Sequence, residues 1–323
     1  MEKKNYSRFQ WMESDLALGA PFIKGQVYHI NNCWHFYTNG DDIDFLFKDE
    51  NDFKNGMNRL YIVSSKFNII ILAFCLMDTH VHFVLYGEFD ECNKFTHEYI
   101  RLTSMDISHK YNERNKMKNV IIGYQIVDND DYLKTVICYV LKNPISAGLH
   151  YMPWDYPWSS GALYFRNQSI WTVPLFLFKD FPERQFVSGR EMKKLLKTND
   201  PLINNDLKLI NGIVYPNEYV AVEICERCFR TPKSYFYYLG KTRNSDVESK
   251  GGIYSSLSIP YQELRQHRKE LCKELFGTDS VRQLSVQQRI HLAKKMKFKY
   301  NSSPKQLARI CCLVYDEVKN LLQ

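Results

Sequence analysis

The sequence contains no apolar run long enough to cross a membrane. The longest, Ile69 to Met77, is far shorter than the roughly 20 apolar residues that a membrane-spanning helix needs. The first residues, MEKKNYSRFQWMESDL, also lack the apolar segment of an export signal. We therefore expect a cytoplasmic protein without a membrane partner.

A disulfide framework and a complete zinc motif are missing as well. The nine cysteines are an odd number and no export signal precedes them, so reduced thiols are expected. Cys225 and Cys228 form a C-x-x-C pair, but a structural zinc site needs a second pair of ligands, and only Cys272 or scattered histidines are available. We do not expect zinc at this pair, and its role stays open.

Acidic residues are absent from a long stretch of the C-terminal third. Residues 211–323 hold 19 Lys and Arg against 11 Asp and Glu, whereas residues 1–210 hold 24 against 25, so the net charge of +7 arises in the last third. The stretch between Val281 and Tyr315 has no acidic residue, and such a block suits a polyanion such as nucleic acid. Its eight basic residues are Arg282, Arg289, Lys294, Lys295, Lys297, Lys299, Lys305 and Arg309.

The length and the apolar content of 45% allow two domains rather than one. A shift to Trp, Pro and Ser in MPWDYPWSS closes the first domain near Phe165. We expect a first domain at residues 1–165, a connecting segment at 166–210, and a basic helical region at 211–323.

Strand and helix patterns are mixed in the first domain. The last of its helices begins at an Asp130 cap and is expected to stop at Pro144, which cannot donate a helical hydrogen bond. This order of elements favours an antiparallel α+β layer. The predicted strands cover residues 25–31, 67–77 and 80–86, and the predicted helices cover residues 53–61, 93–111 and 130–143.

The last third is expected to be mostly helical. Residues 303–310 and 315–322 have the spacing of a helix-turn-helix, because Ser303 can cap a helix that has Pro304 at its first position. The alternative is an ordinary helical bundle, because Asp316 and Glu317 suit a phosphate-facing helix poorly. Contacts to phosphates are expected from Arg289, Lys294, Lys295, Lys297, Lys299, Lys305 and Arg309.

Two histidines one residue apart lie in the apolar stretch FCLMDTHVHFVL. Because side chains alternate between the faces of a strand, His80 and His82 point the same way and could share a metal ion. A buried histidine on a strand is more often a hydrogen-bonded core residue, so the pair needs further ligands nearby.

The helix before Pro144 offers a third ligand and a nucleophile. Tyr139 and Asn143 are four residues apart and share one side of the helix. A tyrosine with a pKa of about 10 becomes a nucleophile when its proton is removed or a cation stabilises the phenolate. Tyr132, seven residues earlier on the same side, is the rival nucleophile, but only Tyr139 has an amide four residues on.

Three motifs stand out, and in chain order they are AFCLM followed by H-V-H, then CYVLKNPISAGL, and then DYPWSS. These motifs resemble those of the HUH single-tyrosine transposases of insertion sequences. They are most similar to the REP-associated tyrosine transposases, which show M-P-N-H-V-H, Y-I-x-x-N-P-V-x-A-G-L and D-Y-P-W-S-S. The resemblance covers roughly residues 20 to 165, and the early VYHI fits the family's opening strand. Asp78 and Thr79 depart from the family's Pro and Asn, and Gly123 to Gln125 replace its usual aromatic and basic residues.

The resemblance implies a ferredoxin-like antiparallel sheet with helices on one face. It implies that His80, His82 and Asn143 bind Mg²⁺ or Mn²⁺ and that Tyr139 attacks single-stranded or hairpin DNA, forming a 5′-phosphotyrosine link that is later resealed. A domesticated DNA-binding regulator without catalysis and a replication or mobilisation nickase of the HUH group are the alternatives; the absence of a G-x-x-x-x-G-K loop argues against an attached helicase. Whether the chain forms a homodimer stays open.

Overall fold

The computed structural model divides the chain into two compact units. The first comprises residues 1–143 and 151–251, and the second comprises residues 144–150 and 252–323. Residues 209–251 therefore belong to the first unit, not to the C-terminal region in which the sequence placed most of them. The structure describes residues 15–18, 20–38, 45–112, 120–166, 189–198, 207, 209–244, 246–248, 261–300, 307–308 and 310–314.

A four-stranded antiparallel sheet, in the order β2-β3-β1-β4, forms the centre of the first unit. Two helices alternate with the strands along the chain, one between β1 and β2 and one between β3 and β4. The expected α+β class with an antiparallel sheet is confirmed. The strands are β1 (Cys33–Thr38), β2 (Ile70–Leu76), β3 (Val81–Tyr86) and β4 (Ile122–Ile126).

The first strand lies later in the chain than predicted. Residues 25–31 make one isolated bridge, between His29 and Asn129, instead of a strand. Their backbone is held by the start of a helix, because Tyr28 N–H donates to Asp130 Oδ1 at 3.0 Å and its carbonyl accepts from Asp130 N–H at 2.9 Å. The prediction of a strand at 25–31 was wrong, and CWHFYT forms β1 instead.

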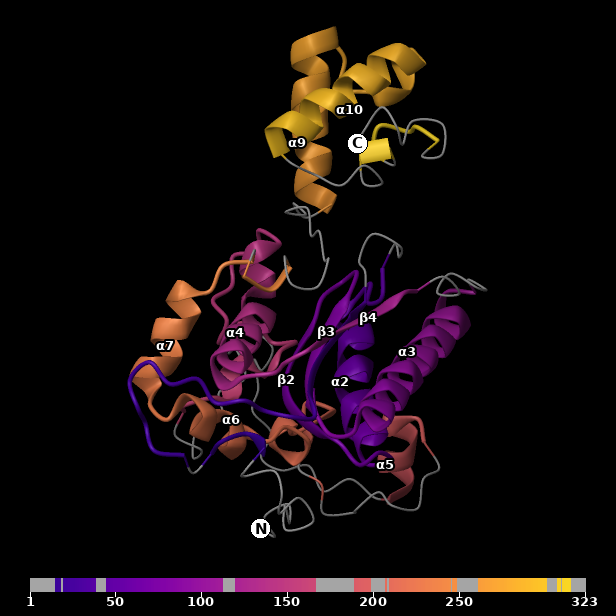
Figure 1. Cartoon of the computed structure of the whole chain (residues 1–323). Helices are drawn as coiled ribbons and strands as arrows, with labels where there is room; N and C mark the ends of the chain where they lie inside the picture. Colours follow the sequence, from indigo (N-terminus) through magenta and orange to yellow (C-terminus); the bar gives the residue numbers. More distant parts are fainter. Residues whose placement is uncertain are drawn as a thin grey trace. The chain divides into compact units, whose positions relative to one another are not determined.

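Helices α2 (Glu50–Ser64) and α3 (Phe89–Tyr111) cover one face of the sheet (Figure 1). Phe83 of β3 packs its ring against Phe95 at 5.6 Å and Tyr99 at 5.0 Å between centroids. The acidic start of α2 matches its predicted position, because the Asp49 side chain accepts from Asp52 N–H and caps the helix.

Helix α4 (Asp130–Ser146) lies on the opposite face of the sheet, so the helices are not confined to one face as expected (Figure 1). It also continues past Pro144 to Ser146. Proline leaves the Val140 carbonyl without its usual helical donor, and the Asn143 side-chain amide lies 3.5 Å from that oxygen. This local replacement accounts for the absence of a break at Pro144.

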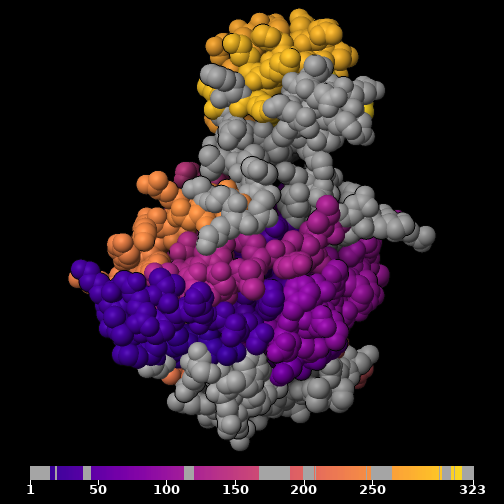
Figure 2. All heavy atoms as spheres, in the orientation of Figure 1, coloured from indigo at the N-terminus to yellow at the C-terminus, as the bar shows by residue number. Residues whose placement is uncertain are grey.

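The segment after residue 208 is attached to the same sheet. Ala221 N–H donates to the carbonyl of Ile71 in β2 at 2.9 Å, and Asn58 of α2 donates to the Gly212 carbonyl at 2.8 Å. Figure 2 shows the orange atoms of this segment against the indigo and magenta atoms of the first unit. The remaining elements are η3 (Ser160–Leu163), α5 (Gly189–Leu196), β5 (Leu209–Ile210), β6 (Ile213–Val214), η5 (Pro216–Glu218), α6 (Val222–Phe229) and α7 (Pro232–Lys241).

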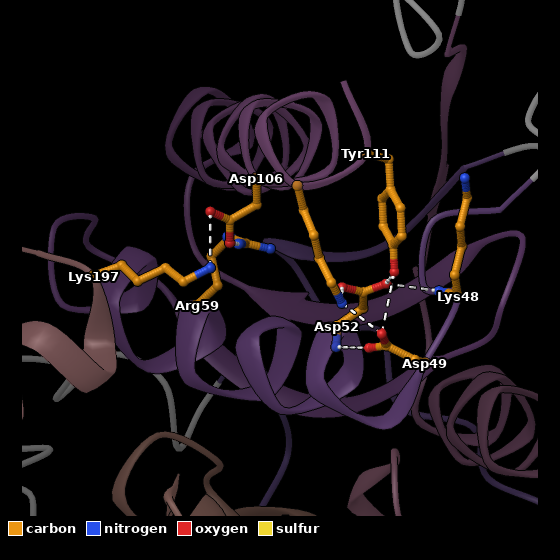
Figure 3. Close-up of polar contacts among 8 residues, drawn as sticks. Lys48, Asp49, Asp52, Arg59, Asp106, Tyr111 and Lys197 are labelled. Atoms are coloured by element: carbon orange, nitrogen blue, oxygen red, sulfur yellow. Dashed lines mark hydrogen bonds and ion pairs between the residues drawn. The ribbon is translucent and has the colours of Figure 1, made fainter. Parts of the chain in front are cut away.

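A network of charged side chains joins α2 to α3 (Figure 3). Lys110 Nζ lies 2.6 Å from Asp49 Oδ2 and 2.7 Å from Asp52 Oδ1, and Tyr111 donates to Asp52 Oδ2 at 2.7 Å. Nearer the other end of α2, Arg59 pairs with Asp106. All these carboxylates have cationic partners, so the network is a structural link between the two helices.

The second unit contains α9 (Tyr261–Phe276), η6 (Val281–Gln283) and α10 (Val286–Tyr300), as the helical pattern predicted. Its own apolar core includes Leu264, Leu292, Met296 and Leu307. The predicted helix-turn-helix at 303–322 lies mostly outside the described residues.

Candidate functional site

Strands β1, β3 and β4 place polar side chains on the sheet face that α4 covers. His82 lies opposite Tyr37, and His35 lies opposite Gln125. Opposed residues in an antiparallel pair point to the same face. Tyr139 of α4 packs edge-on against His82 at 5.6 Å and against His35 at 5.8 Å between ring centroids. We call this set of side chains, which comprises His35, Tyr37, His82, Gln125 and Tyr139, the histidine face.

The two predicted histidine ligands lie close together, although only one belongs to a strand. His80 is in the turn that leads into β3, and His82 is the second residue of β3. Their ring centroids are 5.0 Å apart and the rings are nearly perpendicular, at 88°. His82 is only 3% exposed, whereas His80 is half-buried. The turn therefore places the half-buried imidazole of His80 at the edge of the site, beside the buried His82.

Asn143, the predicted third ligand, meets the histidines from α4. Its Oδ1 lies 3.3 Å from His80 Nε2, and its Nδ2 donates to the Tyr139 carbonyl at 3.3 Å, which orients the amide with its oxygen toward the imidazole. Its side chain also faces His82. The Asn143 amide therefore lies beside both imidazoles.

His35 belongs to the same site but was not predicted. Its Nε2 lies 3.0 Å from His82 Nδ1, and its Nδ1 lies 3.3 Å from Gln125 Oε1. Burial lowers the pKa of His35 to about 4, and burial together with the charges of His80 and His35 lowers the pKa of His82 well below its usual value. Neutral imidazole is the form that binds metal ions.

The strand alternation in CWHFYT contained the signal for His35. His35 and Tyr37 share a face of β1, as do Trp34 and Phe36 on the other. Because the first strand was predicted at residues 25–31, the alternation in CWHFYT lay outside the predicted sheet. The Tyr37 ring lies over Gly123, where a Cβ atom would be 2.3 Å from the ring. The glycine that departs from the family pattern therefore makes room for a tyrosine beside the histidines.

Tyr139, the predicted nucleophile, is 4% exposed and lies between the histidines and a carboxylate. Its hydroxyl is 3.5 Å from Glu248 Oε1. Burial, followed by the negative charge of Glu248, raises the pKa of Tyr139 above its usual value. Glu248 was not predicted, because it lies 109 positions away in the sequence and in no recognisable motif.

The rival tyrosine, Tyr132, is on the same helix but has a different partner. Its hydroxyl donates to Gln125 Oε1 at 3.1 Å, and burial raises its pKa to about 12. The ring contacts with His82 and His35 are made by Tyr139. The geometry favours Tyr139 as the tyrosine nearer the candidate ligands.

A metal ion could be held by two imidazoles and one amide oxygen, a set of nitrogen and oxygen donors. The amide oxygen and the open positions suit Mg²⁺ or Mn²⁺, whereas two histidines alone would favour zinc. Within the described ranges no group of three or more His, Cys, Asp or Glu is arranged to hold a metal ion. The candidate set depends on the amide of Asn143 as its third ligand.

Cys225 and Cys228 lie buried on α6 as free thiols. Burial raises the pKa of Cys228 to about 12 and that of Cys225 well above its usual value. Because a thiol binds zinc as the thiolate, these two residues fit apolar packing better than metal binding.

The basic residues predicted to contact phosphate differ in their surroundings. Lys294, Lys295 and Lys299 are exposed on α10, and Lys297 is half-buried there. Arg289 instead donates to the carbonyls of three residues, at 3.0, 3.3 and 3.1 Å, which fixes it within the second unit. Lys305 and Arg309 lie outside the described residues.

Across the residues that the structure describes, no helix is both long and apolar enough to span a bilayer. Comparisons of the chain with protein-family models, curated proteins and solved structures gave no match. The histidine face therefore has to be interpreted from its own geometry.

Proposed function

We propose that the first unit is a metal-dependent DNA strand transferase of the HUH single-tyrosine type, with a ferredoxin-like catalytic fold. It cleaves and rejoins single-stranded or hairpin DNA through a 5′-phosphotyrosine intermediate. The observation that carries the proposal is the meeting of His80 Nε2 and Asn143 Oδ1 at 3.3 Å beside a buried tyrosine. These residues come from two elements on the same side of the sheet.

His80, His82 and Asn143 would hold a hard divalent cation such as Mg²⁺ or Mn²⁺. The cation supplies a Lewis acid that offsets the negative charge on the phosphodiester oxygens. In the metal-free protein the Asn143 oxygen accepts the Nε2 proton of His80. To hold the ion through Nε2, neutral His80 would carry its proton on Nδ1, which lies 3.0 Å from Thr79 Oγ1.

Tyr139 acts as the nucleophile. Its phenolic oxygen attacks the phosphorus, the bond from phosphorus to the 3′-oxygen breaks, and that oxygen leaves as a 3′-hydroxyl after taking a proton from water. The phenolic proton passes to a base, and Glu248 is the carboxylate that lies 3.5 Å from the hydroxyl. Rejoining reverses these steps: a 3′-hydroxyl attacks the phosphotyrosine and the phenol regains its proton.

The test is formation of a covalent adduct between the full-length protein and labelled hairpin-bearing single-stranded DNA, in the presence of Mn²⁺. Wild-type protein should give a band that survives denaturing electrophoresis. Tyr139→Phe should abolish the band, and Tyr132→Phe, the matched control on the same helix, should keep it. Absence of an adduct in the wild type, or persistence of the adduct in Tyr139→Phe, contradicts the proposal.

The second candidate is a domesticated DNA-binding regulator. The exposed Lys294, Lys295 and Lys299 on α10, in a stretch without acidic residues, favour it. It requires salt-sensitive DNA binding that survives both His80→Ala and Tyr139→Phe, together with no strand cleavage by the wild type. Measurement of binding by fluorescence anisotropy at several salt concentrations, beside the adduct assay, separates the two functions.

A further inference from the structure

A chain of hydrogen bonds leads from the candidate metal ligand His82 to a backbone carbonyl. His82 Nδ1 lies 3.0 Å from His35 Nε2, and His35 Nδ1 lies 3.3 Å from Gln125 Oε1. Gln125 Nε2 then donates to the carbonyl oxygen of Val247 at 3.2 Å. The three side chains are 3%, 0% and 6% exposed, so water competes little for these bonds.

The carbonyl at the end of this chain fixes the direction of every bond in it. A backbone carbonyl can only accept a hydrogen bond, so the group of Gln125 that faces Val247 must be the amide nitrogen. The amide oxygen of Gln125 then faces His35, and it also accepts the hydroxyl of Tyr132 at 3.1 Å. A flipped amide would set two oxygens against each other at Val247.

The fixed amide sets the proton positions on both imidazoles. Because Gln125 Oε1 is an acceptor, the proton of His35 lies on Nδ1. A neutral His35 then has a lone pair on Nε2, which accepts the Nδ1 proton of His82. His82 is left with its lone pair on Nε2, the nitrogen that is free of this chain.

We propose that Gln125 and His35 are positioning residues that hold His82 in its Nδ1–H tautomer and thereby present its Nε2 lone pair to a divalent metal ion. The proposal rests on the proposed function for the identity of the ligand, but the tautomer itself is a property of the metal-free protein. In the other tautomer the His82 ring would donate to the Asn143 side chain, but His82 and His35 would then set two buried lone pairs against each other at 3.0 Å. Partners of this kind typically change metal affinity about 10- to 100-fold when they are removed.

The tautomer can be measured without any variant. In full-length, metal-free protein with ¹⁵N-labelled histidine, long-range ¹H–¹⁵N correlation spectra distinguish Nδ1–H from Nε2–H rings, and single histidine replacements assign the signals. The expected result at neutral pH is Nδ1–H for both His35 and His82. Observation of His82 as Nε2–H, or of His35 as Nε2–H, overturns the proposal.

Substitutions at Gln125 test the consequence for metal binding. Gln125→Met removes the acceptor at similar volume and should weaken Mn²⁺ binding about 10- to 100-fold, measured by electron paramagnetic resonance of free Mn²⁺. Tyr132→Phe, the matched control, removes the other donor to the same oxygen and should stay within about 3-fold of the wild type.

The outcomes separate this proposal from the proposed function. Equal Mn²⁺ affinity in Gln125→Met and the wild type, with both proteins folded by circular dichroism, overturns the positioning role. The expected tautomers and affinity series without any DNA adduct support the positioning role and contradict the strand transferase. If the wild type binds no Mn²⁺, the metal-presenting role is overturned together with the metal dependence of the proposed function, whatever the tautomers.

Discussion

At the residue scale, burial of His35 makes the stability of the protein depend on pH. Its pKa is about 4 in the folded state and about 6.5 in an unfolded chain. Between these values the unfolded chain binds the proton and the folded protein does not, so stability is fully present above pH 6.5 and is lost as the pH falls toward 4. The loss due to His35 is about 3 kcal/mol over that window.

His35→Gln tests this pH dependence, because it removes the titrating ring and leaves an amide. The difference in unfolding free energy between pH 7 and pH 4.5, measured by urea denaturation, should be about 2 to 3 kcal/mol smaller than in the wild type. His97→Gln, at an exposed position of α3, is the matched control and should keep the wild-type difference. An unchanged pH dependence in His35→Gln would show that His35 does not stay neutral through this window.

The sequence predicted four residues of this candidate site and missed three of their neighbours. His80, His82, Tyr139 and Asn143 were found because short local spacings, H-x-H and Y-x-x-x-N, put each pair on a common side. The sequence did not predict His35 and Gln125, because the register between β1 and β4 places them in the site. It did not predict Glu248, because a contact over 109 positions places it beside Tyr139. Such partners leave no spacing signal in a single sequence.

At the element scale, α2 and α3 depend on one lysine for much of their polar contact. Lys110 lies between Asp49 and Asp52, and the Asp52 side chain is only 6% exposed (Figure 3). Its positive charge, together with hydrogen bonds, keeps the pKa of Asp49 below its usual value despite the desolvation that opposes this. Removing the cation leaves two carboxylates, both at the start of α2, without their ammonium partner from α3.

Lys110→Met should therefore lower the free energy of unfolding by about 1 to 3 kcal/mol, since a buried acceptor loses its charged donor. Lys54→Met is the matched control: Lys54 pairs with the half-exposed Glu50 at 2.8 Å on α2 alone, and its loss should cost no more than about 0.5 kcal/mol. Urea denaturation of both variants at neutral pH measures the difference. Equal losses of unfolding free energy in the two variants would mean that Lys110 stabilises the protein no more than an exposed ion pair does.

Elements with strong periodicity were predicted well, and those fixed by tertiary contacts were not. Helix α2 and strands β2 and β3 follow from apolar spacing and nearly continuous apolar runs. Strand β4 is five residues long with only Gln125 buried, and its pairing with β1 defines it. The sequence predicted that α4 ends at Pro144, because the rule that proline ends a helix does not take into account the Asn143 amide near the Val140 carbonyl.

At the scale of the whole molecule, the first unit extends well beyond the segment that carries the motifs. Residues 209–251 belong to it, because Ala221 continues the hydrogen bonding of β2 and Lys142 donates to the carbonyls of Leu239 at 3.0 Å and Thr242 at 2.8 Å. Composition placed the boundary near residue 165, since the Trp- and Pro-rich segment looks like a terminus. Only long-range contacts show that the chain returns to the sheet.

This boundary predicts how fragments behave. A fragment of residues 1–165 lacks the segment that contains η5, α6 and α7, and it exposes the surface that this segment covers, including Phe74, which packs 6.0 Å from the buried Tyr219 between ring centroids. Each large side chain returned to water costs about 1.5 to 3 kcal/mol, and a domain is stable by only about 5 to 15 kcal/mol. The fragment should therefore show no cooperative urea transition, whereas a fragment of residues 1–251 should unfold cooperatively. A cooperative transition of residues 1–165 with the midpoint of the longer fragment would show that α6 and α7 are dispensable to the sheet, and that the motif-bearing segment is a domain by itself.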